Sequence, residues 1–150
     1  MDYLAIAENL IHDERMKMTP WDVRTLAIWL RDECKCVYCQ RDMLESFDTT
    51  YYAWSFEHLL PRSKYPELDH ASWNMMLACR ACNGLKHEWD PNTPDSNTAP
   101  LYVKGSQPTE EERSVLIERA KTHVSEKRRI REALFPTERK LILQKLQSLA

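Results

Sequence analysis

Four of the five cysteines form two pairs with the spacing of zinc ligands: Cys36 with Cys39, and Cys79 with Cys82. A C-x-x-C turn points both thiolates at one point about 2.3 Å away, which is half of a tetrahedral zinc site. Two such turns therefore predict one closed structural zinc site with four thiolate ligands. A redox pair of the thioredoxin kind would explain one of these motifs but not both. Cys34 is expected to be a spare thiol, with a Cys34–Cys36 arrangement of the first turn as the alternative.

Polar residues that could bind a metal, carry a proton or contact a phosphate lie between and just after the two cysteine pairs. They are Glu57 and His58, then Asn74, and finally Asn83, Lys86 and His87. Glu57 and His58 are expected at the end of a strand, and Asn74 at the entry to the short apolar run 75–78. Asn83 directly follows the second cysteine pair.

These elements, taken in order over residues 36–90, resemble the HNH endonucleases, a branch of the His-Me finger (ββα-metal) nucleases. The usual pattern of that family is C-x-x-C, D-H-x-x-P, an Asn, and C-x-x-C-[HN]-x-x-K. The chain departs from it at two positions, with Glu57 in place of the commoner Asp and Asn83 in place of His. It therefore resembles the H-N-N variant, and both departures keep an oxygen that can bind a metal ion.

The resemblance implies hydrolysis of a phosphodiester bond, which needs a base to deprotonate water and a cation to stabilise the developing charge. His58 is the expected general base, because an imidazole with a pKa of about 6.5 suits that task. Glu57 and Asn83 would hold one divalent ion, Mg²⁺ or Mn²⁺, through oxygen atoms.

The resemblance also implies roles for the residues around this centre. In the family the central asparagine, here Asn74, steadies the loop that orients the base. Lys86 would contact the substrate phosphate, and Arg62, close to the expected base, is a further candidate for binding it. His87 corresponds to a metal ligand of the colicin-type relatives, and a His87 that faces solvent or touches a phosphate is the alternative.

Composition excludes several other kinds of chemistry. The chain has 150 residues and only two glycines, Gly84 and Gly105. It therefore cannot contain a dinucleotide-binding fingerprint, a phosphate-binding P-loop or a G-x-S-x-G motif, each of which needs at least two glycines at short fixed spacing. No apolar stretch is long enough to span a membrane, and the start Met1-Asp2-Tyr3 lacks the basic region of a secretory signal. We therefore expect a cytoplasmic protein without a membrane partner.

Charge is uneven along the chain although the net charge is only −2. Residues 109–150 hold 10 basic and 7 acidic side chains, whereas the remainder is acidic. Any electrostatic attraction to DNA phosphates should therefore come from the C-terminal third or from a partner.

Hydrophobic periodicity predicts helices on both sides of the cysteine-containing segment. The first spans 3–16, and the second begins at Pro20 with Thr19 as its N-cap. Residues 51–56 have the composition of a strand.

The remainder of the chain is predicted to be a loop followed by two helices. Residues 89–108, rich in proline, read as a loop that could be mobile. A capping box of Thr109 and Glu112 begins a helix that ends before Pro136. Thr137 then caps a last helix. The inward residues of the two helices are expected to be Leu116, Ala120, Val124 and Ile130 in the first, and Ile142, Leu146 and Leu149 in the second.

The sequence thus predicts an α+β fold: a small ββα-metal core with a structural zinc, flanked by N- and C-terminal helices. The expected segments are 1–33 (helical), 34–90 (nuclease core with zinc), 91–108 (loop) and 109–150 (helical). The expected function is metal-dependent cleavage of DNA. The alternatives are a nuclease subunit that acts only with a targeting protein partner, as in defence or mobile-element systems, and a zinc-braced module that binds nucleic acid or protein without activity. Cleavage of both strands would need a homodimer or a partner assembly.

Overall fold

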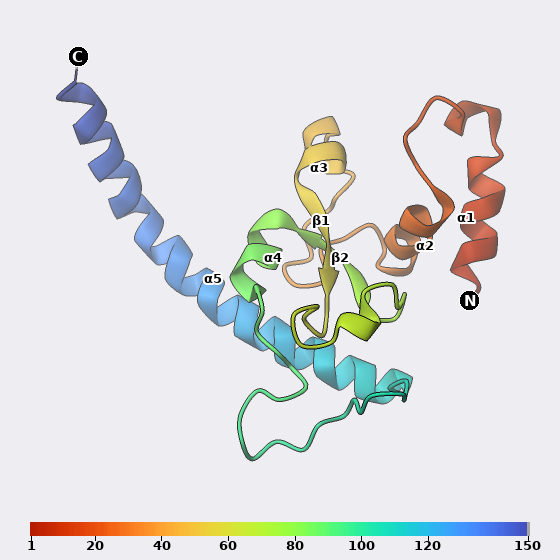
Figure 1. Ribbon diagram of the computed structural model, residues 1–150. Helices are drawn as coiled ribbons and strands as arrows, with labels where there is room; N and C mark the ends of the chain where they lie inside the picture. The colour runs from red at the N-terminus through yellow and green to blue at the C-terminus, as the bar shows by residue number, and fades with distance from the viewer. Residues whose placement is uncertain (150) are drawn as a thin grey trace.

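The computed structural model describes residues 1–149, so only the last residue of the predicted segment 109–150 lies outside it. Seven helices and strands follow one another along these residues, with two short 3₁₀ turns (Figure 1). Their bounds are α1 Tyr3–Ile11, η1 Glu14–Met16, α2 Val23–Arg31, α3 Phe47–Tyr52, β1 Trp54–His58, η2 Pro66–Leu68, β2 Met75–Cys79, α4 Arg80–Lys86 and α5 Glu110–Gln147. The predicted α+β class is confirmed.

The centre of the fold is an antiparallel pair of strands followed at once by a helix. Trp54 of β1 pairs with Cys79 of β2, and His58 pairs with Met75 at the other end. All five residues of β2 are buried, as the apolar run predicts for a strand covered on both faces. Cys79 ends β2 and also caps α4, so its side chain accepts a hydrogen bond from the amide of Cys82. This ββα arrangement sets the end of β1 beside α4.

The N-terminal half of α5 completes the core around these strands. Leu116, Ala120 and Val124 are almost completely buried and follow one another at four-residue spacing on one face of the helix. The other side of the core is covered by α2, whose Trp29 is fully buried and packs edge-on against Trp54 of β1. Helix α1 packs on α2 and lies at the edge of the molecule (Figure 1).

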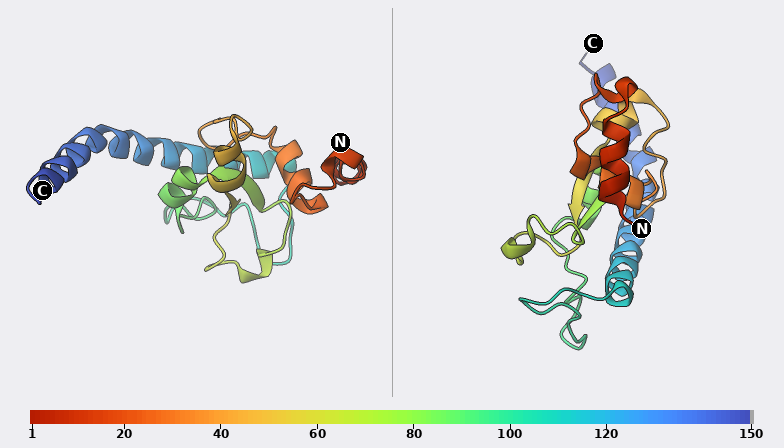
Figure 2. Two further views of the ribbon diagram at one scale, coloured as in Figure 1. Left: turned by 90° about the horizontal axis from the view of Figure 1, so that it is seen from above. Right: turned by 90° about the vertical axis from the view of Figure 1, so that its right-hand side faces the viewer.

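The start of α5 confirms the predicted capping box, but its end does not follow the prediction. The helix continues through Pro136 to Gln147, so the predicted break and the cap at Thr137 are wrong. Proline removes one backbone hydrogen bond and bends a helix, and both effects are tolerated where the backbone faces water. Figure 2 shows the helix bending in its C-terminal third, where it projects away from the rest of the molecule.

The apolar residues of this projecting part were expected to face inward, and that expectation is also wrong. The side chains concerned are all exposed; they are Ile130, Ile142, Leu146 and Leu149.

The predicted N-terminal helices are shorter than expected. The first ends at Ile11 and is followed by the turn η1, and the second begins at Val23 rather than Pro20. Asp22 is its N-cap and accepts a hydrogen bond from the amide of Thr25 at 2.9 Å. Aspartate and threonine are comparable caps, so local sequence did not decide between them.

The predicted strand 51–56 is only partly correct. Tyr51 and Tyr52 belong to α3, which begins after Ser46 because its hydroxyl accepts a hydrogen bond from the amide of Thr49 at 3.1 Å. The strand begins at Trp54 and extends to His58.

Residues 89–108 form the irregular loop that the prolines predict, but two buried residues hold it in place. The side-chain oxygen of Asn92 accepts hydrogen bonds from the amides of Leu101 and Tyr102, both at 2.8 Å. Asp90 accepts a hydrogen bond from the hydroxyl of Tyr65 at 2.9 Å. Within residues 1–149, no helix combines the length and hydrophobicity needed to cross a membrane.

Candidate active site and metal centre

Four cysteine side chains converge at one end of the ββα unit. Cys36 and Cys39 lie in the turn before α3, Cys79 ends β2 and Cys82 lies in the first turn of α4. Their sulfur atoms all lie within 4.8 Å of one another, and those of Cys39 and Cys79 are 3.8 Å apart. Zinc–sulfur bonds of about 2.3 Å in a tetrahedron imply sulfur–sulfur distances of about 3.8 Å. The predicted four-cysteine set is therefore positioned to hold a metal ion, consistent with zinc, and Cys34 lies outside it.

The first cysteine turn is fixed by hydrogen bonds to β2 and within itself. The amide of Val37 donates to the carbonyl of Leu77 at 2.9 Å, and that of Cys36 donates to the carbonyl of Arg41 at 2.9 Å. Gln40 takes a positive φ of 60° to close the turn. The turn therefore sits directly against the strand that carries Cys79.

The four thiols of the cluster are close enough to change one another's protonation. Their mutual hydrogen bonds lower the pKa of Cys39 to about 6 and lower the pKa of Cys79, and they raise the pKa of Cys36 and Cys82. The guanidinium of Arg128, on α5, donates to the sulfur of Cys82 at 3.3 Å. Four thiolates around one divalent ion carry a net charge of −2, which this arginine partly offsets.

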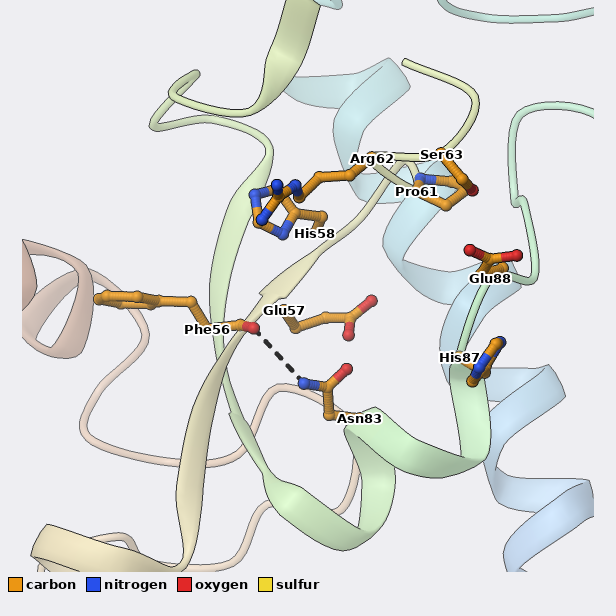
Figure 3. Close-up of a pocket in the computed structure, with 9 residues that line it drawn as sticks. All are labelled: Phe56, Glu57, His58, Pro61, Arg62, Ser63, Asn83, His87 and Glu88. Atoms are coloured by element: carbon orange, nitrogen blue, oxygen red, sulfur yellow. Dashed lines mark hydrogen bonds between the residues drawn. The ribbon is translucent and has the colours of Figure 1, made fainter. Parts of the chain in front are cut away.

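A second site lies at the opposite end of the strand pair, where β1 and α4 border a cavity of about 190 Å³. Nine residues line it. Figure 3 shows Glu57, Asn83, His87 and Glu88 bordering one space, whereas the ring of Phe56 points away from it. The nine lining residues are Phe56, Glu57, His58, Pro61, Arg62, Ser63, Asn83, His87 and Glu88. Five of the residues expected at the site are thus brought together, whereas Asn74 and Lys86 do not line the cavity.

His58 is held by one nitrogen of its ring, which leaves the other available. Its Nε2 lies 3.1 Å from the backbone carbonyl oxygen of Asp69 and 3.4 Å from a carboxylate oxygen of that residue. Since a carbonyl oxygen can only accept a hydrogen bond, Nε2 carries the proton and Nδ1 keeps a free lone pair. Asp69 also pairs with Arg62 at 3.0 Å. No sequence motif indicates Asp69, because it lies in a loop 11 residues after His58.

Asn74 supports the chain that follows His58. It is completely buried, and its side-chain oxygen accepts from the amide of Leu60 at 2.8 Å while its nitrogen donates to the carbonyl of Leu60 at 3.1 Å. The backbone carbonyl of Asn74 accepts from the amide of Leu59 at 2.8 Å. These bonds fix residues 59–60, which directly follow His58.

Glu57 and Asn83 present oxygen atoms toward each other. The side-chain nitrogen of Asn83 donates to the hydroxyl of Ser55 at 2.7 Å and lies 3.4 Å from the carbonyl of Phe56. This orientation turns the amide oxygen of Asn83 toward the carboxylate of Glu57 (Figure 3). Two acceptors that face each other without a donor between them suit a divalent cation with oxygen ligands. The residues present therefore fit the catalytic ion that the resemblance implies.

Lys86 is not where the resemblance led us to expect it. It is 1% exposed, and its ammonium lies 2.6 Å from the Oε1 atom of Glu57 and donates to the carbonyl of His58 at 2.9 Å. The expectation of a contact with substrate phosphate does not fit this placement, because the ammonium lies behind the carboxylate and not in the cavity. The hydroxyl of Tyr38, a residue that sequence reasoning missed, donates to the same Oε1 atom at 3.2 Å.

Burial and the neighbouring donors shift the pKa of Glu57 in opposite directions, and burial has the larger effect. The carboxylate is almost fully buried, which raises the pKa of Glu57, while the charge of Lys86 and the hydrogen bonds of Lys86 and Tyr38 oppose that rise.

His87 follows α4 and lies at the rim of the cavity. It has a positive φ of 49°, its side chain is exposed, and the neighbouring Glu88 also lines the cavity. Within residues 1–149, the cysteines form the only group of three or more His, Cys, Asp or Glu side chains close enough to share one ion. A cation in the cavity would therefore take the oxygens of Glu57 and Asn83 as its main protein ligands.

Comparison with known proteins agrees with this geometry. Residues 36–88 match the family model described as HNH endonuclease. The chain matches no curated protein and no solved structure. The matched segment begins at the first cysteine of the cluster, ends at the last residue of the cavity, and includes both strands and α4. Residues 36–88 are therefore similar to HNH endonucleases, and they contain four cysteines positioned to hold a metal ion.

Proposed function

We propose that this protein is a metal-dependent endonuclease that hydrolyses phosphodiester bonds of DNA, with His58 as the general base. The observation that carries the proposal is the bond from Nε2 of His58 to Asp69, which leaves Nδ1 of a half-buried imidazole free on the cavity that Glu57 and Asn83 also line. A base and a cation-binding pair on one cavity are what hydrolysis of a phosphodiester needs.

The residues of the cavity have distinct tasks in the proposed reaction. Nδ1 of His58 takes a proton from water, whose oxygen then forms a bond to phosphorus. The bond from phosphorus to one sugar oxygen breaks, and the leaving oxygen takes a proton from solvent. A divalent ion on Glu57 and Asn83 would stabilise negative charge on the phosphate and on the leaving oxygen. Arg62, which is exposed at the rim and held by Asp69, would bind a phosphate group.

Each chain offers one such base, so each site would cut one strand. Cleavage of both strands would require two copies of the chain or a partner that supplies a second site.

The test is relaxation of a supercoiled plasmid by the zinc-loaded protein in Mg²⁺ or Mn²⁺. We expect His58→Ala to lower the rate of nicking by about 10²- to 10⁴-fold, the usual contribution of a general base. The matched control is His70→Ala, because His70 lies in the same loop region but is exposed and does not line the cavity. Equal nicking by wild type and His58→Ala would remove His58 from this role.

A second candidate is a nuclease subunit that requires a targeting partner. Two observations favour it: the net charge is −2, and the projecting part of α5 exposes several large apolar residues, such as Leu141 and Ile142. A nuclease that finds DNA unaided normally carries a basic surface. Tight, salt-dependent binding of DNA by the purified chain would argue against this candidate, and binding without metal-stimulated cleavage would instead indicate a binding module.

A further inference from the structure

The buried ion pair between Lys86 and Glu57 occupies an unusual place, because one of its members is the carboxylate that faces the cavity. The side chains of Lys86 and Glu57 are 0% and 2% exposed. The ammonium lies 2.6 Å from Oε1 of Glu57, and Tyr38 donates to the same oxygen. Oε1 is thus already engaged by two donors from inside the protein, and Oε2 is the carboxylate oxygen left for an ion.

The charges of this group cancel before any ion binds. Glu57 contributes one negative charge, Lys86 one positive charge, and Asn83 none. An ammonium this close to the carboxylate, in a buried region, repels a divalent cation on the other side of that carboxylate far more strongly than it would in solvent. Affinity for hard cations such as Mg²⁺ or Mn²⁺ depends on the number of charged oxygen ligands.

We infer that Lys86 keeps the affinity of the free protein for a divalent cation low, so that the ion is held firmly only when a phosphodiester adds its negative charge at the cavity. This inference rests on the proposed function, since it concerns the same site. Lys86 is then a positioning residue that acts through Glu57, without touching the substrate. By linkage, the ion and DNA must raise each other's affinity by the same factor.

The direct test measures binding of Mn²⁺ to the zinc-loaded protein without DNA, with electron paramagnetic resonance as the readout. The measurement is made at pH 8 to limit competition from protons for Glu57. We expect Lys86→Met to bind Mn²⁺ about tenfold or more tightly than wild type, because removal of the ammonium restores the charge of Glu57. Loss of binding in Glu57→Gln would assign the signal to this site. Equal or weaker binding by Lys86→Met would overturn the inference.

The matched control is Lys121→Met, which removes the same charge from an exposed pair with Glu118. It should leave Mn²⁺ affinity unchanged. A gain of similar size in Lys121→Met would show a general effect of net charge and would also overturn the inference.

Lys86 is fully buried, so its variants must first be shown to fold, by zinc content and circular dichroism. Lys86→Gln provides a second variant, since it removes the charge but keeps a hydrogen-bond donor for Glu57. It should also bind Mn²⁺ more tightly than wild type. If neither variant binds Mn²⁺ more tightly than wild type, the proposed role of the Lys86 charge is contradicted.

A second measurement leaves Lys86 in place and therefore decides the matter even if neither variant folds. We expect the Mn²⁺ affinity of His58→Ala to rise about tenfold or more when a short DNA duplex is added, because the phosphodiester supplies the missing charge. The double variant His58→Ala/Glu57→Gln measures Mn²⁺ bound to the DNA alone. No rise above that background would overturn the inference.

Failure of this inference can be told apart from failure of the proposed function. Nicking that depends on His58, combined with unchanged Mn²⁺ affinity in a folded Lys86→Met variant, would reject the inference alone. Tighter Mn²⁺ binding in Lys86→Met without nicking by wild type would reject the function and leave the role of Lys86 standing.

Discussion

The cysteine cluster and the cavity are two polar sites on the same strand pair and helix, yet they are built in opposite ways. The cluster gathers four identical soft ligands whose sulfur atoms all lie within 4.8 Å of one another. The cavity offers a few oxygen atoms from Glu57 and Asn83, with room of about 190 Å³ beside them. Four thiolates fill a tetrahedron and leave no open position, whereas two oxygens leave positions for water and substrate. The comparison separates a site suited to holding the fold from a site suited to chemistry.

One helix joins the two sites. Cys82 and Asn83 are neighbours in α4, so the cluster and the cavity share a rigid element. Tyr38 makes a second connection, because it lies between Cys36 and Cys39 in sequence and donates to Glu57. A disturbance of the cluster should therefore reach the cavity, whereas the loss of a cavity side chain should leave the cluster intact.

The largest effect is expected from breaking the cluster. Cys79→Ser should prevent residues 34–90 from folding, because a structural zinc site contributes about 10–16 kcal/mol, comparable to the entire stability of a small domain. Zinc content and the near-ultraviolet circular dichroism of the tryptophans should both fall. Cys34→Ser is the control and should change neither, since Cys34 lies outside the cluster. A folded, zinc-free Cys79→Ser protein would contradict the structural role of the cluster.

A smaller effect is expected from Asn74→Ala, which affects the cavity without touching a cysteine. The variant leaves the buried amide and carbonyl of Leu60 without partners, at a cost of about 2–4 kcal/mol in the free energy of unfolding. Nicking should also fall, because the loop after His58 loses its support, while zinc content stays at one per chain. Urea denaturation measures the first effect. Loss of zinc from the folded variant would show that the two sites are less separate than we propose.

The next prediction concerns Arg128, the residue of α5 that reaches the cluster. Arg128→Met removes the guanidinium that lies 3.3 Å from the sulfur of Cys82, and loss of such a partner outside the ligand set typically lowers metal affinity by 10- to 100-fold. A colorimetric chelator competition should detect faster release of zinc. Arg129→Met is the matched control, because Arg129 is exposed and pairs only with Glu126. Equal release by both variants would reject a specific role for Arg128.

The cluster was easier to predict from the sequence than the cavity, for a physical reason. A C-x-x-C turn is a local feature, so spacing alone indicates the four ligands and leaves Cys34 aside. The capping box at Thr109 is local in the same sense, and it is confirmed. The pairing of Lys86 with Glu57 depends instead on how α4 crosses β1, 29 positions earlier in the chain, and no local pattern carries that information.

The same distinction between local and long-range information explains the other differences between the predicted and the observed structure. Asp69 approaches His58 through a loop whose path is set by the core, so its sequence shows no motif. Pro136 is a strong local signal for a helix end, yet α5 continues because that stretch is exposed and its backbone can bond to water. The division at residues 33, 90 and 108 and the roles assigned to the cavity residues stay predictions.

The smallest effect is expected from His123, which lies on α5 and stacks on Trp89 with ring centres 4.2 Å apart. Partial burial lowers the pKa of His123, and the charges of Lys127 and Lys86 add to this effect. At pH values between the folded and the unfolded pKa of His123, the unfolded chain therefore holds more protons than the folded chain. The free energy of unfolding then rises with pH, and the stability that the neutral His123 contributes is lost as the pH falls below about 6.5. The side chain is only partly buried, so solvent screening keeps this contribution below about 1 kcal/mol. Urea denaturation between pH 5 and 8 should show a flatter pH dependence for His123→Phe than for wild type, and parallel curves would show that His123 does not titrate with folding.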